Sequence, residues 1–139
     1  MPYTADHVRA LRERRVSDVV NLCEDREYWD GERAAVEAAY AAAGIREHRL
    51  PVTDGSTVPA DVFDAAVAAS GEGVLFVHCR GGRERSATVC AAVLSRQRNV
   101  DVQEALRIAQ QANPVFRPLD WQLRGLIAWS TPQFFQNLG

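Results

Sequence analysis

The stretch VLFVHCRGGRERSAT, residues 74–88, joins an apolar segment to a helical pattern through a loop of glycines and arginines. The short run VLFV has a glycine before it and a polar loop after it, which fits a strand at the centre of a parallel sheet covered on both faces. Beyond the loop, apolar residues keep helical spacing at Val89, Cys90, Val93 and Leu94. The stretch therefore predicts a strand, a tight loop and a helix in immediate succession.

Extended and helical patterns alternate through the first two thirds of the chain, and helical patterns dominate its end. Extended segments are expected at residues 17–23, 45–52 and 74–77. Helices are expected after a cap at Thr4 or Asp6, from Asp30 to a C-cap at Gly44, from Pro59, in the segment after the loop, and in the tail. This order favours an α/β fold with a central, mostly parallel sheet of about four strands flanked by helices.

The composition is that of a globular protein rather than a disordered or membrane protein, with 47% apolar and 24% charged residues among 139. We expect one domain over residues 1–139. The formal net charge of -2 provides no overall field for nucleic acid. No signal peptide or membrane span is evident, so we expect a cytoplasmic protein, with a monomer as the simplest assembly.

The three cysteines, Cys23, Cys79 and Cys90, are too few for a disulfide framework and lack the paired spacing of a zinc site. Cys90 lies on the apolar stripe of its helix and is expected in the core. Cys23 ends a strand that could neighbour VLFV, so it is either a buried thiol, the simpler expectation, or a resolving disulfide partner for Cys79.

The loop that follows VLFV has the features of an anion site. Parallel sheets bind ligands beyond the carboxyl ends of their strands, where a loop that opens a helix directs backbone N–H groups toward an anion. Gly81 and Gly82 allow a tight curl, and Arg85 can offer two parallel donors to phosphate oxygens. These groups favour the thiolate of Cys79, so its pKa should fall below the ~8.5 of free cysteine. Cys79 is therefore a candidate nucleophile beneath a bound phosphate.

The segment HCRGGRERS, residues 78–86, resembles the His-Cys-x5-Arg-Ser signature of the protein tyrosine phosphatase superfamily, and its flanks are most similar to the dual-specificity branch. Upstream, LPVTDGSTVP (50–59) resembles the general-acid loop of that branch. Downstream, NPVFRPLDWQL (113–123) loosely resembles a family segment with an Asn and a later Gln-Leu, here Asn113 and Gln122. Together these motifs cover most of the chain.

The resemblance implies dephosphorylation through a cysteinyl-phosphate intermediate, with no metal and no cofactor. Cys79 would attack phosphorus while Arg85 and the loop amides hold the oxygens, and Asp54 would protonate the departing oxygen and later activate water. By the same resemblance Ser86 donates to the sulfur of Cys79, and His78 orients the loop and lowers the thiol pKa.

Two of these roles have plain structural alternatives. Asp54 could instead stabilise the bend of TDGS as an Asx turn. His78 could be a satisfied core histidine.

The substrate-binding loop departs from the family at one position. Glu84 stands where small or uncharged residues are usual, and it would repel phosphate unless it turns outward or pairs with Arg80 or Arg83. Those two arginines could be solvated rim charges, or they could attract an anionic substrate. The full expected binding set is Arg80, Gly81, Gly82, Arg83, Glu84 and Arg85.

The function predicted is hydrolysis of phosphotyrosine in proteins, with phosphoserine and phosphothreonine as further candidates. Phosphoinositides, inositol phosphates and RNA 5′-phosphates are alternative phosphomonoesters, because Arg80 and Arg83 resemble the pattern of lipid phosphatases in the superfamily. A pseudophosphatase that only binds phosphorylated partners is a third possibility. A rhodanese-type sulfurtransferase fits the Arg-Ser ending and the upstream Asp54 less well.

Overall fold

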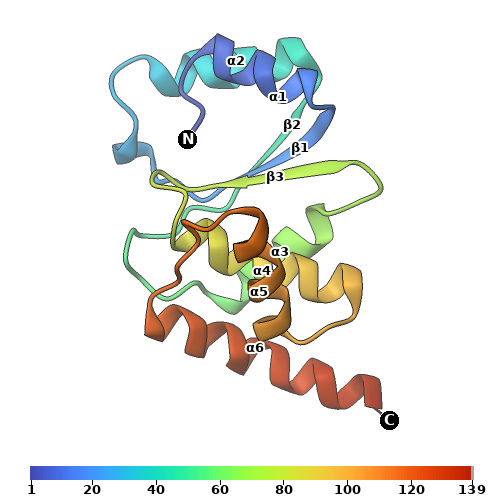
Figure 1. Cartoon of the computed structure of the whole chain (residues 1–139). Coiled ribbons are helices and arrows are strands. Elements are labelled where there is room, and N and C mark those ends of the chain that lie inside the picture. The colour runs from blue at the N-terminus through green and yellow to red at the C-terminus, as the bar shows by residue number, and fades with distance from the viewer. Residues whose placement is uncertain (139) are drawn as a thin grey trace.

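The computed structural model describes residues 1–138, and the side chains of residues 1–131. Strands β1 (Val16–Asn21), β2 (Arg46–Arg49) and β3 (Val74–His78) form a three-stranded parallel sheet in the order β2-β1-β3. The helices are α1 (Ala5–Glu13), the short 3-10 helix η1 (Asp25–Glu27), α2 (Glu32–Ala43), α3 (Ala60–Ala69), α4 (Arg85–Arg98), α5 (Val102–Ala112) and α6 (Asp120–Leu138). Figure 1 shows α1 and α2 on one face of the sheet and α3 to α6 on the other. The predicted α/β class is confirmed.

Two expectations about the sheet were wrong. It has three strands rather than about four, and the apolar β3 lies at an edge, where Val74 is 48% exposed. The central strand is β1, although it carries the buried polar residues Asp18 and Asn21. Both have polar partners. Asp18 pairs with Arg46 and His48 of β2, and the amide of Asn21 donates to Glu47 of β2 and to the hydroxyl of Tyr28. Partners of this kind allow a polar strand to be central, which hydropathy alone does not indicate.

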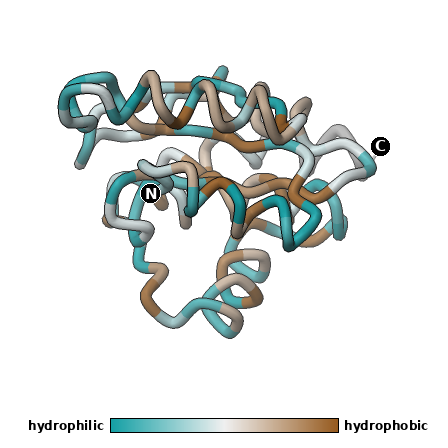
Figure 2. The backbone as a smooth tube through the Cα atoms, turned by 90° about the horizontal axis from the view of Figure 1, so that it is seen from above, coloured by the Kyte–Doolittle hydropathy of each residue, from teal (hydrophilic) through white to brown (hydrophobic). Residues whose placement is uncertain are grey.

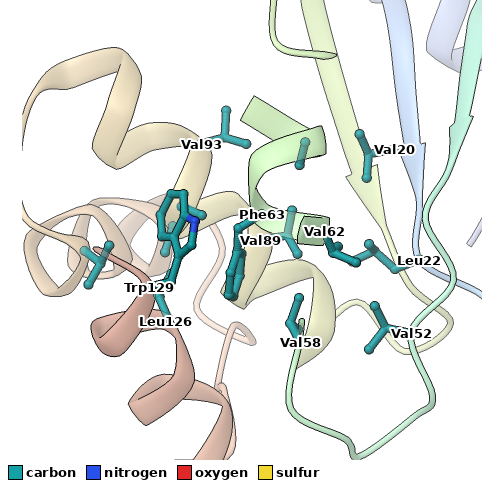
Figure 3. Packing of buried hydrophobic residues seen from close by; sticks show 14 of the residues in the cluster. Val20, Leu22, Val52, Val58, Val62, Phe63, Val89, Val93, Leu126 and Trp129 are labelled. Carbon is teal, nitrogen blue, oxygen red and sulfur yellow. The ribbon is translucent and has the colours of Figure 1, made fainter. Parts of the chain in front are cut away.

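The larger part of the hydrophobic core fills the space between the sheet and α3 to α6. Figure 3 shows Phe63 of α3 facing Trp129 of α6, with ring centroids 5.1 Å apart. The same figure labels their neighbours Val20, Leu22, Val52, Val58, Val62, Val89, Val93 and Leu126. A smaller cluster lies between the sheet and the pair α1 and α2. Along the tube of Figure 2, hydrophilic and hydrophobic segments alternate in the helices, as expected when one side packs on the sheet.

The helix ends follow the sequence with one exception. Thr4 caps α1, its hydroxyl accepting from the backbone N–H of His7 at 3.3 Å, and Gly44 ends α2. The expected start of α2 at Asp30 was wrong, because the N-cap is Gly31 in the left-handed conformation that glycine tolerates. No helix in the described part of the chain is both long enough and apolar enough to cross a membrane.

The parallel register brings three strand ends to one edge of the sheet. Asn21 at the end of β1 is level with Arg49 of β2 and with His78 of β3. The segments that leave these strands, residues 22–31, 50–59 and 79–84, therefore start side by side. This edge is where parallel sheets bind their ligands.

Candidate active site

Cys79 lies directly after β3 and is 3% exposed. Its Sγ is 3.3 Å from Oγ of Ser86, which lies in the first turn of α4. Between them the loop turns through Gly82, whose φ of +68° is strained for any other residue, whereas Gly81 lies outside the left-handed region. Of the two glycines, Gly82 is the one whose backbone the turn requires.

The surroundings of Cys79 favour its thiolate. Burial by itself raises the pKa of the thiol, but hydrogen bonds from the hydroxyl and N–H of Ser86 and the N–H of Gly82 lower it, as does the charge of Arg85. The net result is a pKa below the ordinary value. Since a thiolate can only accept, the Ser86 hydroxyl donates to sulfur in the reactive form. The predicted contact between Ser86 and Cys79 is therefore present.

Arg85 is buried, with 1% of its surface exposed, and is held by an unforeseen partner. Its Nη1 and Nη2 donate to the two carboxylate oxygens of Glu27 at 2.9 and 2.7 Å. Nη1 also donates to the backbone carbonyls of Val52 at 2.8 Å and Leu22 at 3.3 Å. These acceptors come from the segments after β2 and β1, so all three loops of the edge meet at this guanidinium.

Glu27, in η1, is the functional residue that sequence reasoning missed. Burial raises the pKa of Glu27, but hydrogen bonds and the charge of Arg85 lower it by more. The pKa of the carboxyl is therefore held below its usual range. One of its oxygens also accepts from the backbone N–H of Glu24 at 2.7 Å, in a capping box. The only hint in the sequence is the acidic run CEDRE just after a strand, because a buried arginine needs a counter-charge.

One side of the Arg85 guanidinium stays open. Its Nε is buried without a hydrogen-bond partner among the described residues, although the end of the fork is taken by Glu27. Because a guanidinium carries five N–H donors in one plane, Nε–H and the adjacent N–H of Nη2 form a second, parallel pair. Such a pair matches two oxygens of a tetrahedral oxyanion.

Asp54 lies beside that open pair. Its Oδ1 is 3.5 Å from Nη2 of Arg85, while its side chain is 69% exposed. The turn is closed by the backbone N–H of Ser56, which donates to Thr53 at 3.0 Å, and by the left-handed Gly55. The Asp54 carboxylate makes no hydrogen bond within this turn in the described chain, so the contact with Arg85 is its recorded interaction. The structure thus brings Asp54 to the cysteine loop.

His78 is 3% exposed, and its Nδ1 lies 3.3 Å from the carbonyl oxygen of Cys79. Burial lowers the pKa of His78 to about 4, so the imidazole is neutral near pH 7. A neutral ring supplies no positive charge to the thiolate. What remains of its predicted role is orientation of the loop through the Cys79 carbonyl.

The rim residues differ in their contacts. Arg80 donates to the backbone carbonyl of Glu27 and so joins the loop to η1. The carbonyl of Arg83 accepts from the N–H of Arg117 at 2.7 Å. Glu84 is half-buried and has no ion pair among the described residues, and it lines a groove of about 640 Å³ together with Arg83 and the segment before α6. Of the two alternatives for Glu84, pairing with Arg80 or Arg83 is absent among the described residues, and its side chain borders the groove instead.

The other two cysteines differ from each other. Cys23 is a fully buried free thiol, as the simpler expectation had it, and burial raises its pKa to about 12. The expectation that Cys90 belongs to the core was wrong, because it is only partly buried and lines a groove between β3 and α5. The edge strand β3 leaves that side of α4 uncovered.

The model of the family described as "Dual specificity phosphatase, catalytic domain" matches residues 11–132. The chain belongs to this family. Among curated proteins, this dual specificity phosphatase domain is 36% identical to dual specificity phosphatase 28 of Homo sapiens in an alignment of 88 positions that covers 55% of this chain. The match covers 47% of that relative, so the chain spans about half the length of the curated protein it resembles.

Solved structures agree on the fold. The phosphatase domain superposes on PTPMT1 in complex with PI(5)P with a TM-score of 0.86 at 21% identity, covering 100% of this chain and 91% of that one. It superposes on human DUSP28 with a TM-score of 0.68 at 26% identity, covering 96% and 92%. Both comparisons cover nearly the whole chain, so the likeness is one of the whole fold.

Proposed function

We propose that this dual specificity phosphatase domain is an active, cysteine-dependent phosphomonoesterase. The observation that carries the proposal is the unpaired Nε–H of the buried Arg85, which follows the loop that begins with Cys79 and has Asp54 3.5 Å from its Nη2. Nucleophile, oxyanion donor and acid thus converge on one small volume. Convergence of all three favours turnover over the binding-only role of a pseudophosphatase.

The reaction has two steps. The thiolate of Cys79 attacks phosphorus, the bond from phosphorus to the ester oxygen breaks, and Asp54 gives that oxygen its proton. Water then attacks the cysteinyl phosphate, Asp54 takes a proton from it, and the thiolate leaves with the help of the Ser86 hydroxyl. Arg85 and the loop amides hold the oxygens of phosphorus in both steps.

The anion cup consists of Arg85 and the backbone N–H groups of the loop after Cys79. The buried pair of Glu27 and Arg85 fixes this cup before substrate arrives. Glu27 occupies the end of the guanidinium, which points the open N–H pair away from it. An arginine fixed in this way loses little side-chain entropy when it binds phosphate. The thiolate chemistry also suits the cytoplasm, whose reducing environment keeps cysteines free.

We infer phosphotyrosine in proteins as the substrate class, with phosphoserine and phosphothreonine next. The family is the support for this choice. Phosphoinositides are the second candidate, because Arg80 and Arg83 lie exposed at the rim and the similar fold of PTPMT1 holds PI(5)P. Arg80 is engaged with the Glu27 carbonyl, which leaves Arg83 as the freer of the two cations.

The deciding experiment compares kcat/KM on a panel of phosphopeptides and on a panel of phosphoinositides presented in the same buffer. We expect phosphotyrosine peptides to have the highest values. Higher values for lipid head groups would replace the protein substrate with a lipid one. Binding of phosphopeptides without any turnover would establish a pseudophosphatase, and thiosulfate turnover without phosphatase activity would establish a sulfurtransferase.

A further inference from the structure

The loop that carries Asp54 is attached to the first turns of α6. The indole Nε1 of Trp121 donates to the carbonyl of Gly55 at 2.8 Å, and the amide of Gln122 donates to the carbonyl of Ser56 at 3.1 Å. These carbonyls belong to the two residues that follow Asp54. One turn later the Thr57 side chain packs against the helix backbone, because a Cβ on Gly125 would lie 2.8 Å from Cγ2 of Thr57. Three consecutive residues of the loop therefore contact one helix.

On the helix side of this contact, the start of α6 is firmly held. Gln122 is fully buried, and its Oε1 accepts from the backbone N–H of Leu119 at 3.0 Å. Farther along α6, the indole N–H of Trp129 donates to Asp64 of α3 at 2.9 Å, in the core that Figure 3 shows. The start of α6 is thus anchored to the same core that supports the catalytic loop.

The loop end is held less firmly. The Asp54 side chain is 69% exposed, and Gly55 is left-handed, with open space where a side chain would be. Trp121 is itself 46% exposed and forms part of the groove wall opposite Arg83 and Glu84. Although its ring is half-exposed, the indole N–H of Trp121 has a hydrogen-bond partner. Here the N–H reaches the residue next to the acid.

We propose that Trp121 is a positioning residue that holds the loop of residues 53–58 so that Asp54 stays beside the open side of Arg85. The proposal rests on the function proposed above, in which Asp54 is the acid. Trp121 does not touch the reacting atoms in this account. It raises the fraction of molecules in which the carboxyl is in place when the ester bond breaks.

The consequence depends on the leaving group. A hydrogen bond of ordinary strength corresponds to about a fivefold change in the equilibrium constant between the placed and the displaced loop, and this is the upper limit for the change in that fraction. An ester such as phenyl phosphate, whose leaving oxygen needs a proton, should lose rate in proportion. Dinitrophenyl phosphate has a leaving group that is stable without a proton, so its rate should hardly depend on where Asp54 lies.

The test is the Trp121→Phe variant, which keeps an aromatic ring and removes the N–H. We expect kcat/KM for phenyl phosphate to fall by up to about fivefold, with the value for dinitrophenyl phosphate unchanged. Inhibition by tungstate should stay as in the wild type, because the anion cup is untouched. The matched control is Trp129→Phe, which removes an indole hydrogen bond to α3 from the same helix. It should lower the thermal midpoint and leave the ratio of the two esters unaltered.

The inference would be overturned if the ratio of the two esters in Trp121→Phe stayed at the wild-type value, whether both rates fell equally or neither fell. A change of ratio in Trp129→Phe as large as in Trp121→Phe would also overturn it, since general loosening of α6 would then be enough. Failure of the wild-type protein to hydrolyse either ester is a different outcome, and it would remove the proposed function itself.

Discussion

Arg85 and Asp54, two charged groups that lie beside each other in the site, are held in opposite ways. Arg85 is 1% exposed and bonded to a carboxylate and two backbone carbonyls, whereas Asp54 is 69% exposed and 3.5 Å from its nearest recorded partner. In the proposed reaction Arg85 presents its donors in one fixed geometry to a dianion. Asp54 would meet leaving groups of different shapes and then exchange a proton with water. The anion cup around Arg85 is therefore the rigid part of the site, and the loop that carries Asp54 is the accessible part.

The largest effect is expected from Cys79, the proposed nucleophile in the anion cup. Cys79→Ser should remove phosphomonoester hydrolysis altogether, because serine is a far weaker nucleophile without a base beside it. Tungstate should still bind, since Arg85 and the loop amides remain. Cys90→Ser is the matched control, because Cys90 lies in the groove between β3 and α5, and it should stay active. Turnover by Cys79→Ser at the wild-type rate would show that another group attacks phosphorus.

Asp54→Asn tests the exposed acid. We expect kcat/KM for phenyl phosphate to fall by about a hundredfold, the lower end of what a positioned acid contributes. Dinitrophenyl phosphate should lose much less. Asp61→Asn, in the first turn of α3, is the control for loss of a nearby negative charge and should behave as the wild type. Equal losses with both esters would make Asp54 a structural residue of its turn.

The partner of the arginine offers the next test. Glu27→Gln leaves the buried Arg85 without its counter-charge, so it should lower the free energy of unfolding by about 3 kcal/mol and kcat/KM by about tenfold. Glu104→Gln removes a pair with Arg107 on the exposed surface of α5 and should leave the free energy of unfolding nearly unchanged. Similar losses in the two variants, measured by urea unfolding, would contradict the fixed geometry of the cup.

The same pair predicts how stability depends on pH. The pKa of Glu27 is lowered in the folded protein from its ordinary 4.5, so its contribution is complete above that value and is lost as pH falls through the lowered pKa. The wild-type protein should therefore lose stability below about pH 4.5, and Glu27→Gln should lose less of it over that window. Parallel pH profiles for the two proteins would mean that Glu27 titrates normally.

The smallest effect is expected from the hydroxyl that tunes the nucleophile. Ser86 lowers the pKa of Cys79, so Ser86→Ala should move the acidic limb of the kcat/KM profile to higher pH. The second step should slow as well, because the departing thiolate loses a donor. Ser95→Ala, which removes a hydroxyl bond to the Val100 carbonyl at the far end of α4, should shift neither. An unmoved acidic limb in Ser86→Ala would exclude Ser86 from tuning.

The sequence predicted what is contiguous in the chain. Cys79, Arg85 and Ser86 lie within one loop and the start of one helix, so their spacing already specifies their meeting. The α/β class was also predictable, because extended and helical patterns alternate along the chain and each pattern is local. The placement of Asp54 beside Arg85 was predicted only through the family resemblance, because the acid loop follows a different strand.

What the sequence could not predict depends on distant partners. Glu27 meets Arg85 across 58 positions, and Trp121 meets Gly55 across 66. The edge position of β3 was missed for the same reason, since the polar β1 becomes central only through charges on β2. In each case a polar group is placed by a partner that no local pattern reveals.

The central claim is that the cup formed around Cys79 and Arg85 transfers phosphate through sulfur. The most direct measurement mixes the protein with a phosphomonoester, quenches with acid within the first turnovers, and locates any covalent phosphate by peptide mass spectrometry. We predict phosphate on Cys79, present in the wild type and absent from Cys79→Ser. Steady turnover with no phosphate on Cys79, or with phosphate on another residue, would contradict the account.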